Sequence, residues 1–122
     1  IIKWKQEINS EIRPVLVSDY LITISNEGLM VVLNKTDGNI LRINDILKNT
    51  KKKRRKDFYP VGFIISDSKL YLTTSNGRLF IINFSDASLY KVLKLDKEKL
   101  QRPVYFNKEL FIAKDNSIIK IN

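Results

Sequence analysis

An all-β fold built from repeated four-stranded antiparallel sheets is predicted by three observations in this 122-residue sequence. The first is a pattern that occurs three times, beginning at Pro14, Pro60 and Pro103, which are 46 and 43 residues apart. The second is that turn residues divide each copy into short apolar segments, whereas helical patterns are scarce. The third is a nearly all-apolar run in each copy, which indicates a strand buried on both faces. Four strands in a repeat of about 40–45 residues are typical of a β-propeller blade.

The first copy, residues 13–43, is predicted to be one complete blade. Pro14 opens its first strand, where a missing N–H is tolerated. A turn at Gly28 connects the second strand to the third, the apolar run 29–33. A further turn that ends at Gly38 leads into the fourth strand.

Residues 59–95 predict a second blade, and residues 102–122 predict the first three strands of another. In the second blade the dipeptide Asn76-Gly77 is the strongest short signal for a hairpin. In the last copy Asn116 takes the place of this Gly, because Asn is the next best residue for a left-handed backbone position.

Residues 1–9 are predicted to be the last strand of a preceding blade, because Trp4 aligns with Arg42 and Lys91 in the fourth strands. At the other end, Asn122 aligns with the end of a third strand. The predicted strands add up to three blades, whereas closed propellers typically have 4–8. We therefore expect a segment of a larger, eight-bladed ring, or copies of the chain that self-associate through free edges.

Composition excludes several classes of site. The chain has no His and no Cys, so Ser-His-Asp and Cys-His nucleophiles, ordinary zinc sites and disulfides are excluded. Its apolar runs are far shorter than the ~20 residues of a membrane-spanning helix. We predict no catalytic residues, no metal site and no bound cofactor.

The net charge of +9 comes mostly from one segment, the predicted inter-blade loop 44–58. Without its seven basic residues the chain has 15 positive and 13 negative residues. The loop is interpreted either as a solvated segment of repelling charges or as a site for an anionic partner. Nucleic acid is disfavoured, because Phe58 and Tyr59 lead directly into a strand and are predicted core residues, not stacking platforms. The candidate anion- or partner-binding residues are Lys51, Lys52, Lys53, Arg54, Arg55 and Lys56.

The turn after each third strand carries a family resemblance. The segment Leu33-Asn34-Lys35-Thr36-Asp37-Gly38 resembles the Leu-Asp-x-x-Thr-Gly-x-x-x-Trp repeat of pyrroloquinoline-quinone-type (PQQ-like) propellers. The chain departs from this pattern, because Asn replaces Asp, Ala87 replaces Gly in the second copy, and the Trp survives only at Trp4. We predict that Trp4, Gly28, Gly38 and Gly77 pack blades together.

Such degeneration is similar to that of non-catalytic members, and the chain is closest in style to the outer-membrane assembly lipoprotein family BamB. That resemblance implies a cofactor-free periplasmic scaffold that binds the central barrel subunit, BamA. One alternative is a fragment of a quinoprotein dehydrogenase, which would need calcium ligands and aromatic residues around the quinone. Another is an anion-binding module that uses residues 51–56. The carboxylates that could bind calcium in a dehydrogenase all lie in predicted turns, at Asp19, Asp37, Asp67, Asp86 and Asp115.

Overall fold

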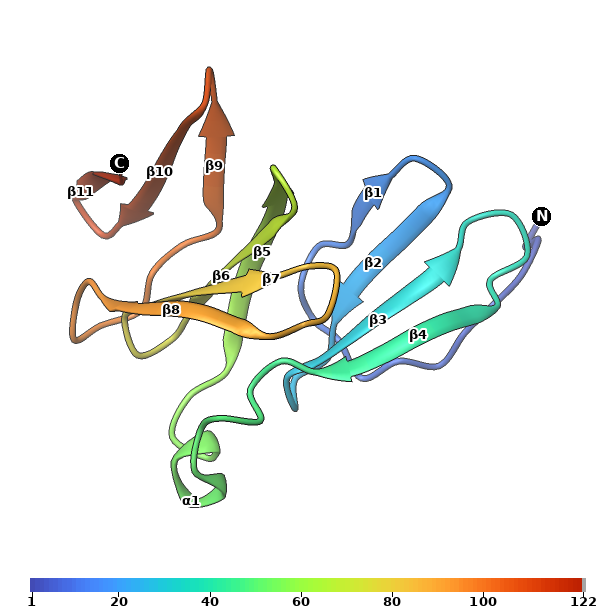
Figure 1. Cartoon of the computed structure of the whole chain (residues 1–122), viewed down its shortest axis with the longest axis horizontal. Helices are drawn as coiled ribbons and strands as arrows, with labels where there is room; N and C mark the ends of the chain where they lie inside the picture. Colours follow the sequence, from blue (N-terminus) through green and yellow to red (C-terminus); the bar gives the residue numbers. More distant parts are fainter. Residues whose placement is uncertain (122) are drawn as a thin grey trace.

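The computed structural model describes residues 1–121 and confirms the all-β prediction (Figure 1). The first sheet consists of β1 (Val15–Val17), β2 (Tyr20–Ile24), β3 (Leu29–Asn34) and β4 (Ile40–Asp45). The second consists of β5 (Pro60–Ser66), β6 (Lys69–Thr74), β7 (Arg78–Asn83) and β8 (Leu89–Lys94). The third consists of β9 (Pro103–Phe106), β10 (Glu109–Lys114) and β11 (Ser117–Ile121). Asn122, the predicted end of a third strand, lies outside the described residues.

Each sheet is an antiparallel meander in which strands pair in the order of the sequence. The first strands of the three sheets lie together, since β5 contacts both β1 and β9. Figure 1 shows the sheets fanning out one after another from these strands. This is the arrangement of consecutive propeller blades, as the repeat predicted.

The hydrophobic core lies between the sheets and explains the apolar strands. Phe63 and Ile65 of β5 pack toward the first sheet, whereas Ile64 packs toward the third. In β7, Phe80 packs toward the first sheet and Leu79 packs toward the third. The middle sheet is thus covered on both sides, so period-2 alternation of apolar and polar residues is lost there.

Residues 1–9 differ from the prediction, because they form no strand in the described structure. They run instead across the first sheet, where the backbone N–H of Asn26 donates to the carbonyl of Asn9 at 2.8 Å. Ser10 continues this contact through a hydrogen bond from its Oγ to the Ile24 carbonyl at 2.7 Å. A strand needs a neighbouring strand to satisfy its backbone groups. The described sheet that lacks a fourth strand is the third one, with β11 at its edge, whereas residues 1–9 lie against the first sheet.

The last hairpin corrects a detail of the repeat. The positive φ falls on Asp115, at 30°, and not on Asn116. Lys114 pairs with Ser117, so the loop has two residues. In a two-residue hairpin of type II′ the first central residue has the positive φ. This loop is one residue shorter than the corresponding loops of the other two copies. The residue with the positive φ is therefore Asp115, and not the residue that aligns with Gly28 and Gly77.

Candidate functional site

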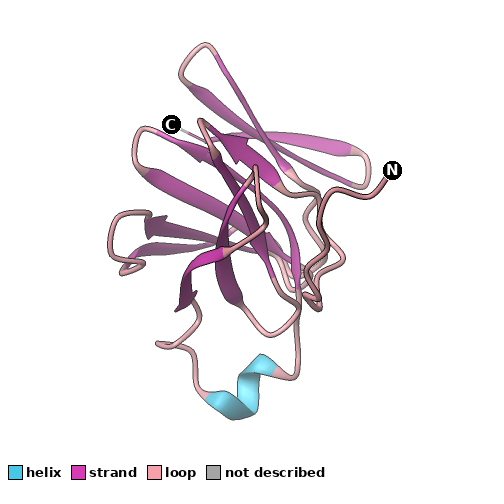
Figure 2. Ribbon diagram, turned by 90° about the vertical axis from the view of Figure 1, so that its right-hand side faces the viewer, coloured by secondary structure: helices cyan, strands magenta, loops and turns pink. Residues whose placement is uncertain are grey.

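The predicted basic loop contains one turn of helix, α1 (Lys52–Arg55), in the connection between β4 and β5. Figure 2 shows this helix projecting from one end of the sheets. Arg55 anchors the connection, because its Nη1 lies 3.0 Å from Asp45 Oδ2 and its Nε donates to the Thr50 carbonyl at 3.2 Å. A third bond runs from Nη2 to the carbonyl of Leu47. Arg55 is thus a structural residue, in contrast to its neighbours in the run.

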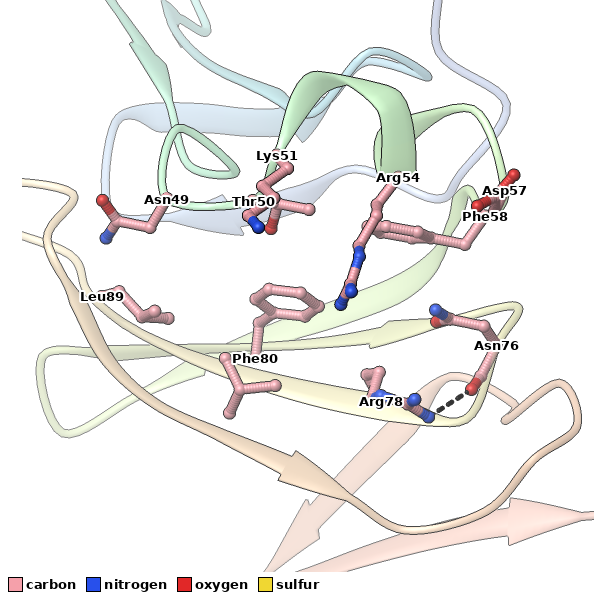
Figure 3. A pocket seen from close by; sticks show the side chains of 11 residues that line it. Asn49, Thr50, Lys51, Arg54, Asp57, Phe58, Asn76, Arg78, Phe80 and Leu89 are labelled. Carbon is pink, nitrogen blue, oxygen red and sulfur yellow. Dashed lines mark hydrogen bonds between the residues drawn. The ribbon is translucent and has the colours of Figure 1, made fainter.

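A pocket of about 450 Å³ lies between this connection and strands β7 and β8 (Figure 3). We call it the cationic pocket, for the charges of Lys51, Arg54 and Arg78 among its lining residues. Its apolar part includes Phe58 and Phe80, whose rings stack with centroids 6.1 Å apart. The remaining lining residues are Asn49, Thr50, Asp57, Asn76, Leu89 and Val92.

The two arginines of the cationic pocket are held differently. Arg78 is fixed, because its Nη1 donates to the carbonyls of Asn76 at 2.8 Å and Asp96 at 3.2 Å. Arg54 extends from α1 into the pocket toward strand β7 in Figure 3. Within residues 1–121 its side chain has no hydrogen-bond or ion-pair partner. The arrangement suits a ligand that joins an anionic group to an apolar one.

The residues of the predicted basic run therefore have different surroundings in the structure. It brings Lys51 and Arg54 into the cationic pocket, leaves Lys52, Lys53 and Lys56 outside the pocket lining, and uses Arg55 as an anchor. Arg78 and Phe80 were missed by the sequence reasoning, because they lie in a strand more than twenty residues from the run. No local signal in the sequence connects these strand residues to the loop.

Trp4 and Gly38, two of the predicted blade-packing residues, lie against each other. The indole Nε1 of Trp4 donates to the Lys35 carbonyl at 2.9 Å, in the turn between β3 and β4. A Cβ added at Gly38 would lie 2.3 Å from Trp4 Cε3, so the ring occupies the space that a side chain would fill. Gln6 adds a hydrogen bond to the Gly38 carbonyl at 3.0 Å.

The other two predicted packing glycines lie where a hairpin meets the connection to the next sheet. A Cβ at Gly28 would lie 2.4 Å from Cδ1 of Leu47, a side chain in the connection after β4. A Cβ at Gly77 would lie 2.1 Å from the carbonyl oxygen of Asp96, in the connection after β8. Both glycines thus allow a hairpin to approach the chain that links two sheets.

Two of the turn carboxylates, Asp37 and Asp86, bind donors of their own turns, whereas Asp67 accepts a hydrogen bond from the Tyr105 hydroxyl at 3.1 Å and Asp19 pairs with Lys35 at 3.6 Å. Asp37 accepts a hydrogen bond from the Asn39 backbone N–H at 2.9 Å. Asp86 accepts bonds from the Ser88 hydroxyl at 2.7 Å and backbone N–H at 3.0 Å, and these bonds hold the pKa of Asp86 below its ordinary range. Within residues 1–121 no three His, Cys, Asp or Glu residues form a group that could hold a metal ion.

No helix among the described residues is long and apolar enough to span a membrane.

Comparison with known proteins gives matches by structure alone. No protein-family model matches the chain, and no curated protein matches it by sequence. BamB from Moraxella catarrhalis matches with a TM-score of 0.70 and 16% identity, over 93% of this chain and 31% of that chain. The β-propeller domain of Cps50 (Swd1) from Myceliophteria thermophila matches with a TM-score of 0.66 and 14% identity, over 85% of this chain and 37% of that chain.

Quinohemoprotein alcohol dehydrogenase ADHIIG from Pseudomonas putida HK5 matches with a TM-score of 0.63 and 16% identity, over 90% of this chain and 18% of that chain. The chain thus spans well under half the length of each of these structures. At such identities the likeness shows the fold. The chain folds as blades of a β-propeller and resembles both BamB and the PQQ-type dehydrogenases, as the repeat predicted.

Proposed function

We propose that this chain is part of a non-enzymatic propeller scaffold that binds other proteins, as a BamB-like subunit in the assembly of outer-membrane β-barrel proteins. The observation that carries the proposal is the fold likeness to BamB, which extends over nearly the whole chain. In this role the protein would act in the periplasm, beside the outer membrane, with a BamA-like barrel subunit as its partner.

The distribution of polar groups supports a binding role. The carboxylates of Asp37 and Asp86 accept hydrogen bonds from backbone and hydroxyl donors of their own loops. Arg54, whose side chain has no hydrogen-bond or ion-pair partner within residues 1–121, extends from an inter-blade connection into a pocket. Loops of this kind on a rigid sheet scaffold are where binding residues concentrate.

A quinoprotein dehydrogenase segment is the second candidate, because the chain also resembles such an enzyme in fold. This reading requires residues around a quinone and calcium ligands of carboxylate and amide type. The two candidates predict different behaviour of the same purified chain, so one set of measurements separates them.

The test measures binding of the purified chain to the isolated periplasmic domains of BamA from the same organism by biolayer interferometry. We expect saturable binding, with an unrelated propeller domain of similar net charge as the control. A parallel sample receives pyrroloquinoline quinone and calcium before gel filtration. Co-elution of quinone absorbance with the chain, without binding to the BamA domains, would replace the scaffold with the dehydrogenase.

A further inference from the structure

We propose that the cationic pocket binds a carboxylate-bearing apolar peptide segment of a partner protein, with the carboxylate held between Arg54 and Arg78. This inference rests on the proposed function, because it takes the partner to be a protein, and it names the chemistry that the partner presents.

The charges of the pocket are the first step. Arg54 has no side-chain partner within residues 1–121, and the bonds of Arg78 go to neutral carbonyl groups. Lys51 adds a third positive charge, and Asp57 is the single carboxylate of the lining. The pocket thus has an excess of positive charge that its own residues leave uncompensated. A guanidinium group binds a carboxylate through two parallel charge-assisted hydrogen bonds, which gives both strength and orientation.

The apolar part of the pocket is the second step. Phe80 is only 5% exposed, and Phe58 stacks on it, so the two rings form a fixed apolar wall. Leu89 and Val92 of β8 extend this wall. A volume of about 450 Å³ lies within the range of sites for small ligands, and it accommodates an apolar side chain beside the carboxylate. Apolar contact and ion pairing are therefore available in one site.

The third step separates a peptide from a nucleic acid. Base stacking requires exposed aromatic faces, whereas in the pocket Phe80 is buried and Phe58 already stacks on it. Tyr59, predicted as a core residue, is instead half exposed, but it lies outside the pocket lining. Lys52 and Lys53, which would extend a phosphate track along α1, lie outside the pocket lining. The geometry thus fits a single carboxylate next to an apolar side chain better than a polyanion.

The probe is the peptide acetyl-Leu-Glu-Leu-amide, titrated into the ¹⁵N-labelled chain while amide chemical shifts are recorded. The neutral control is acetyl-Leu-Gln-Leu-amide, and acetyl-Leu-Gln-Leu with a free carboxyl end tests a terminal carboxylate as the source of charge. We expect shifts at Arg54, Asn76 and Phe80 with either charged peptide and none with the neutral one. The stronger of the two charged peptides identifies which carboxylate the pocket takes.

Two variants with the same change in charge complete the test. Arg54→Gln should weaken binding of the charged peptide about tenfold or more, because it removes a charge-assisted hydrogen bond to the carboxylate. Lys53→Gln, on the same helix but outside the pocket, should change it less than twofold. Equal weakening by both variants, or equal binding of the neutral peptide, would overturn the assignment.

A second experiment titrates an oligothymidylate of ten nucleotides into the chain at physiological salt. If this oligonucleotide binds more tightly than the charged peptide, the assignment is overturned. These results distinguish failure of the pocket assignment from failure of the proposed function. If the chain binds the BamA domains while the peptides leave the pocket unshifted, the pocket assignment fails and the scaffold proposal stands. If peptides bind but the BamA domains do not, the scaffold identity fails and the pocket stands.

Discussion

Trp4 and Arg42 are different side chains that make the same kind of contact in successive blades. Trp4 donates its Nε1–H to the Lys35 carbonyl, and Arg42 donates from Nη2 to the Phe84 carbonyl. Lys35 and Phe84 occupy the same position, directly after the Asn that ends a third strand. The Arg42 guanidinium also lies 5.1 Å from the centroid of the Phe84 ring. The degenerate repeat therefore keeps the hydrogen bond while it exchanges the indole for a cation.

A double-mutant cycle tests whether the indole requires the glycine beneath it. The Trp4 ring leaves no space for a Cβ at Gly38, whereas the corresponding residue in the second blade is Ala87, with a φ of 60°. We expect Arg42→Trp alone to destabilise the chain and Arg42→Trp with Ala87→Gly to recover stability. The coupling free energy should be about 1–3 kcal/mol, measured by urea denaturation. Additive effects of the two substitutions would show that the ring and the glycine are independent.

Gly77→Ala should destabilise the chain more than Gly28→Ala. Both positions have a left-handed backbone, which costs a Cβ-bearing residue about 1–2 kcal/mol. At Gly28 the added methyl meets side-chain atoms of the buried Leu47, and a side chain can shift more readily than a backbone carbonyl. At Gly77 it meets the backbone carbonyl of Asp96, which is fixed between two sheets. Urea denaturation of the two variants measures the difference, and an equal loss of unfolding free energy would contradict this account.

Asp86 should make the stability of the chain sensitive to acid. The Ser88 hydroxyl and then its backbone N–H bind the Asp86 carboxylate and lower its pKa in the folded chain. Because the folded pKa lies below the unfolded one, the stabilisation is present above the unfolded pKa and is lost as the pH falls through the folded pKa. Ser88→Ala should move the Asp86 pKa up toward its ordinary value. Titration of the Asp86 carboxyl carbon by NMR measures this pKa. An unchanged pKa would show that the Ser88 hydroxyl is not the group that lowers it.

At the scale of elements, the strands were predictable and the helix was not. Strand positions follow from local features, such as the apolar run of β7 and the turn at Gly77. The basic run was predicted as a loop, because like charges repel. The helix α1 within it is held by Arg55, whose partners Asp45 and Leu47 lie ten and eight residues upstream. Pairing across such a loop depends on the path of the chain, which the local pattern does not contain.

Arg55→Gln should therefore loosen the connection between the first two sheets. It removes the ion pair to Asp45 and the bonds to the Leu47 and Thr50 carbonyls. We expect faster hydrogen exchange at the backbone N–H of Leu47 and a loss of roughly 1–3 kcal/mol in unfolding free energy. Lys53→Gln makes the same change in charge without these bonds, so its effect should stay within about 0.5 kcal/mol. Similar exchange rates in the two variants would contradict the anchoring role.

At the scale of the whole molecule, the repeat predicted the succession of sheets, while the cationic pocket could not be predicted. The pocket joins Arg54 of the connection to Arg78 and Phe80 of β7, and it forms only once the second sheet packs beside α1. Residues 1–9 illustrate the same limit. Their sequence aligns with a fourth strand, but they form no strand, because they lie against the first sheet whereas the sheet without a fourth strand is the third.

The outward face of the third sheet leads to a last prediction, that the isolated 14.3 kDa chain self-associates. Val104, Phe106 and Ile118 lie on this face and are 58%, 66% and 76% exposed. Leu16 and Ile43 are more than half exposed on the outward face of the first sheet, at the other end of the fan. Two different apolar faces at opposite ends favour head-to-tail contact, because burial of apolar area stabilises association.

Light scattering should therefore give a mass that rises above that of the monomer with concentration. Val104→Lys with Ile118→Lys should return the chain to a monomer, because burying two unpaired charges between sheets is strongly unfavourable. Tyr59→Lys is the control, since this residue is 50% exposed in the connection before β5 and belongs to neither of the two apolar faces. If the control dissociates the assembly as fully as the double variant, added charge and not the outward face governs association. A constant monomer mass at all concentrations would instead mean that these apolar faces are tolerated in water by this chain.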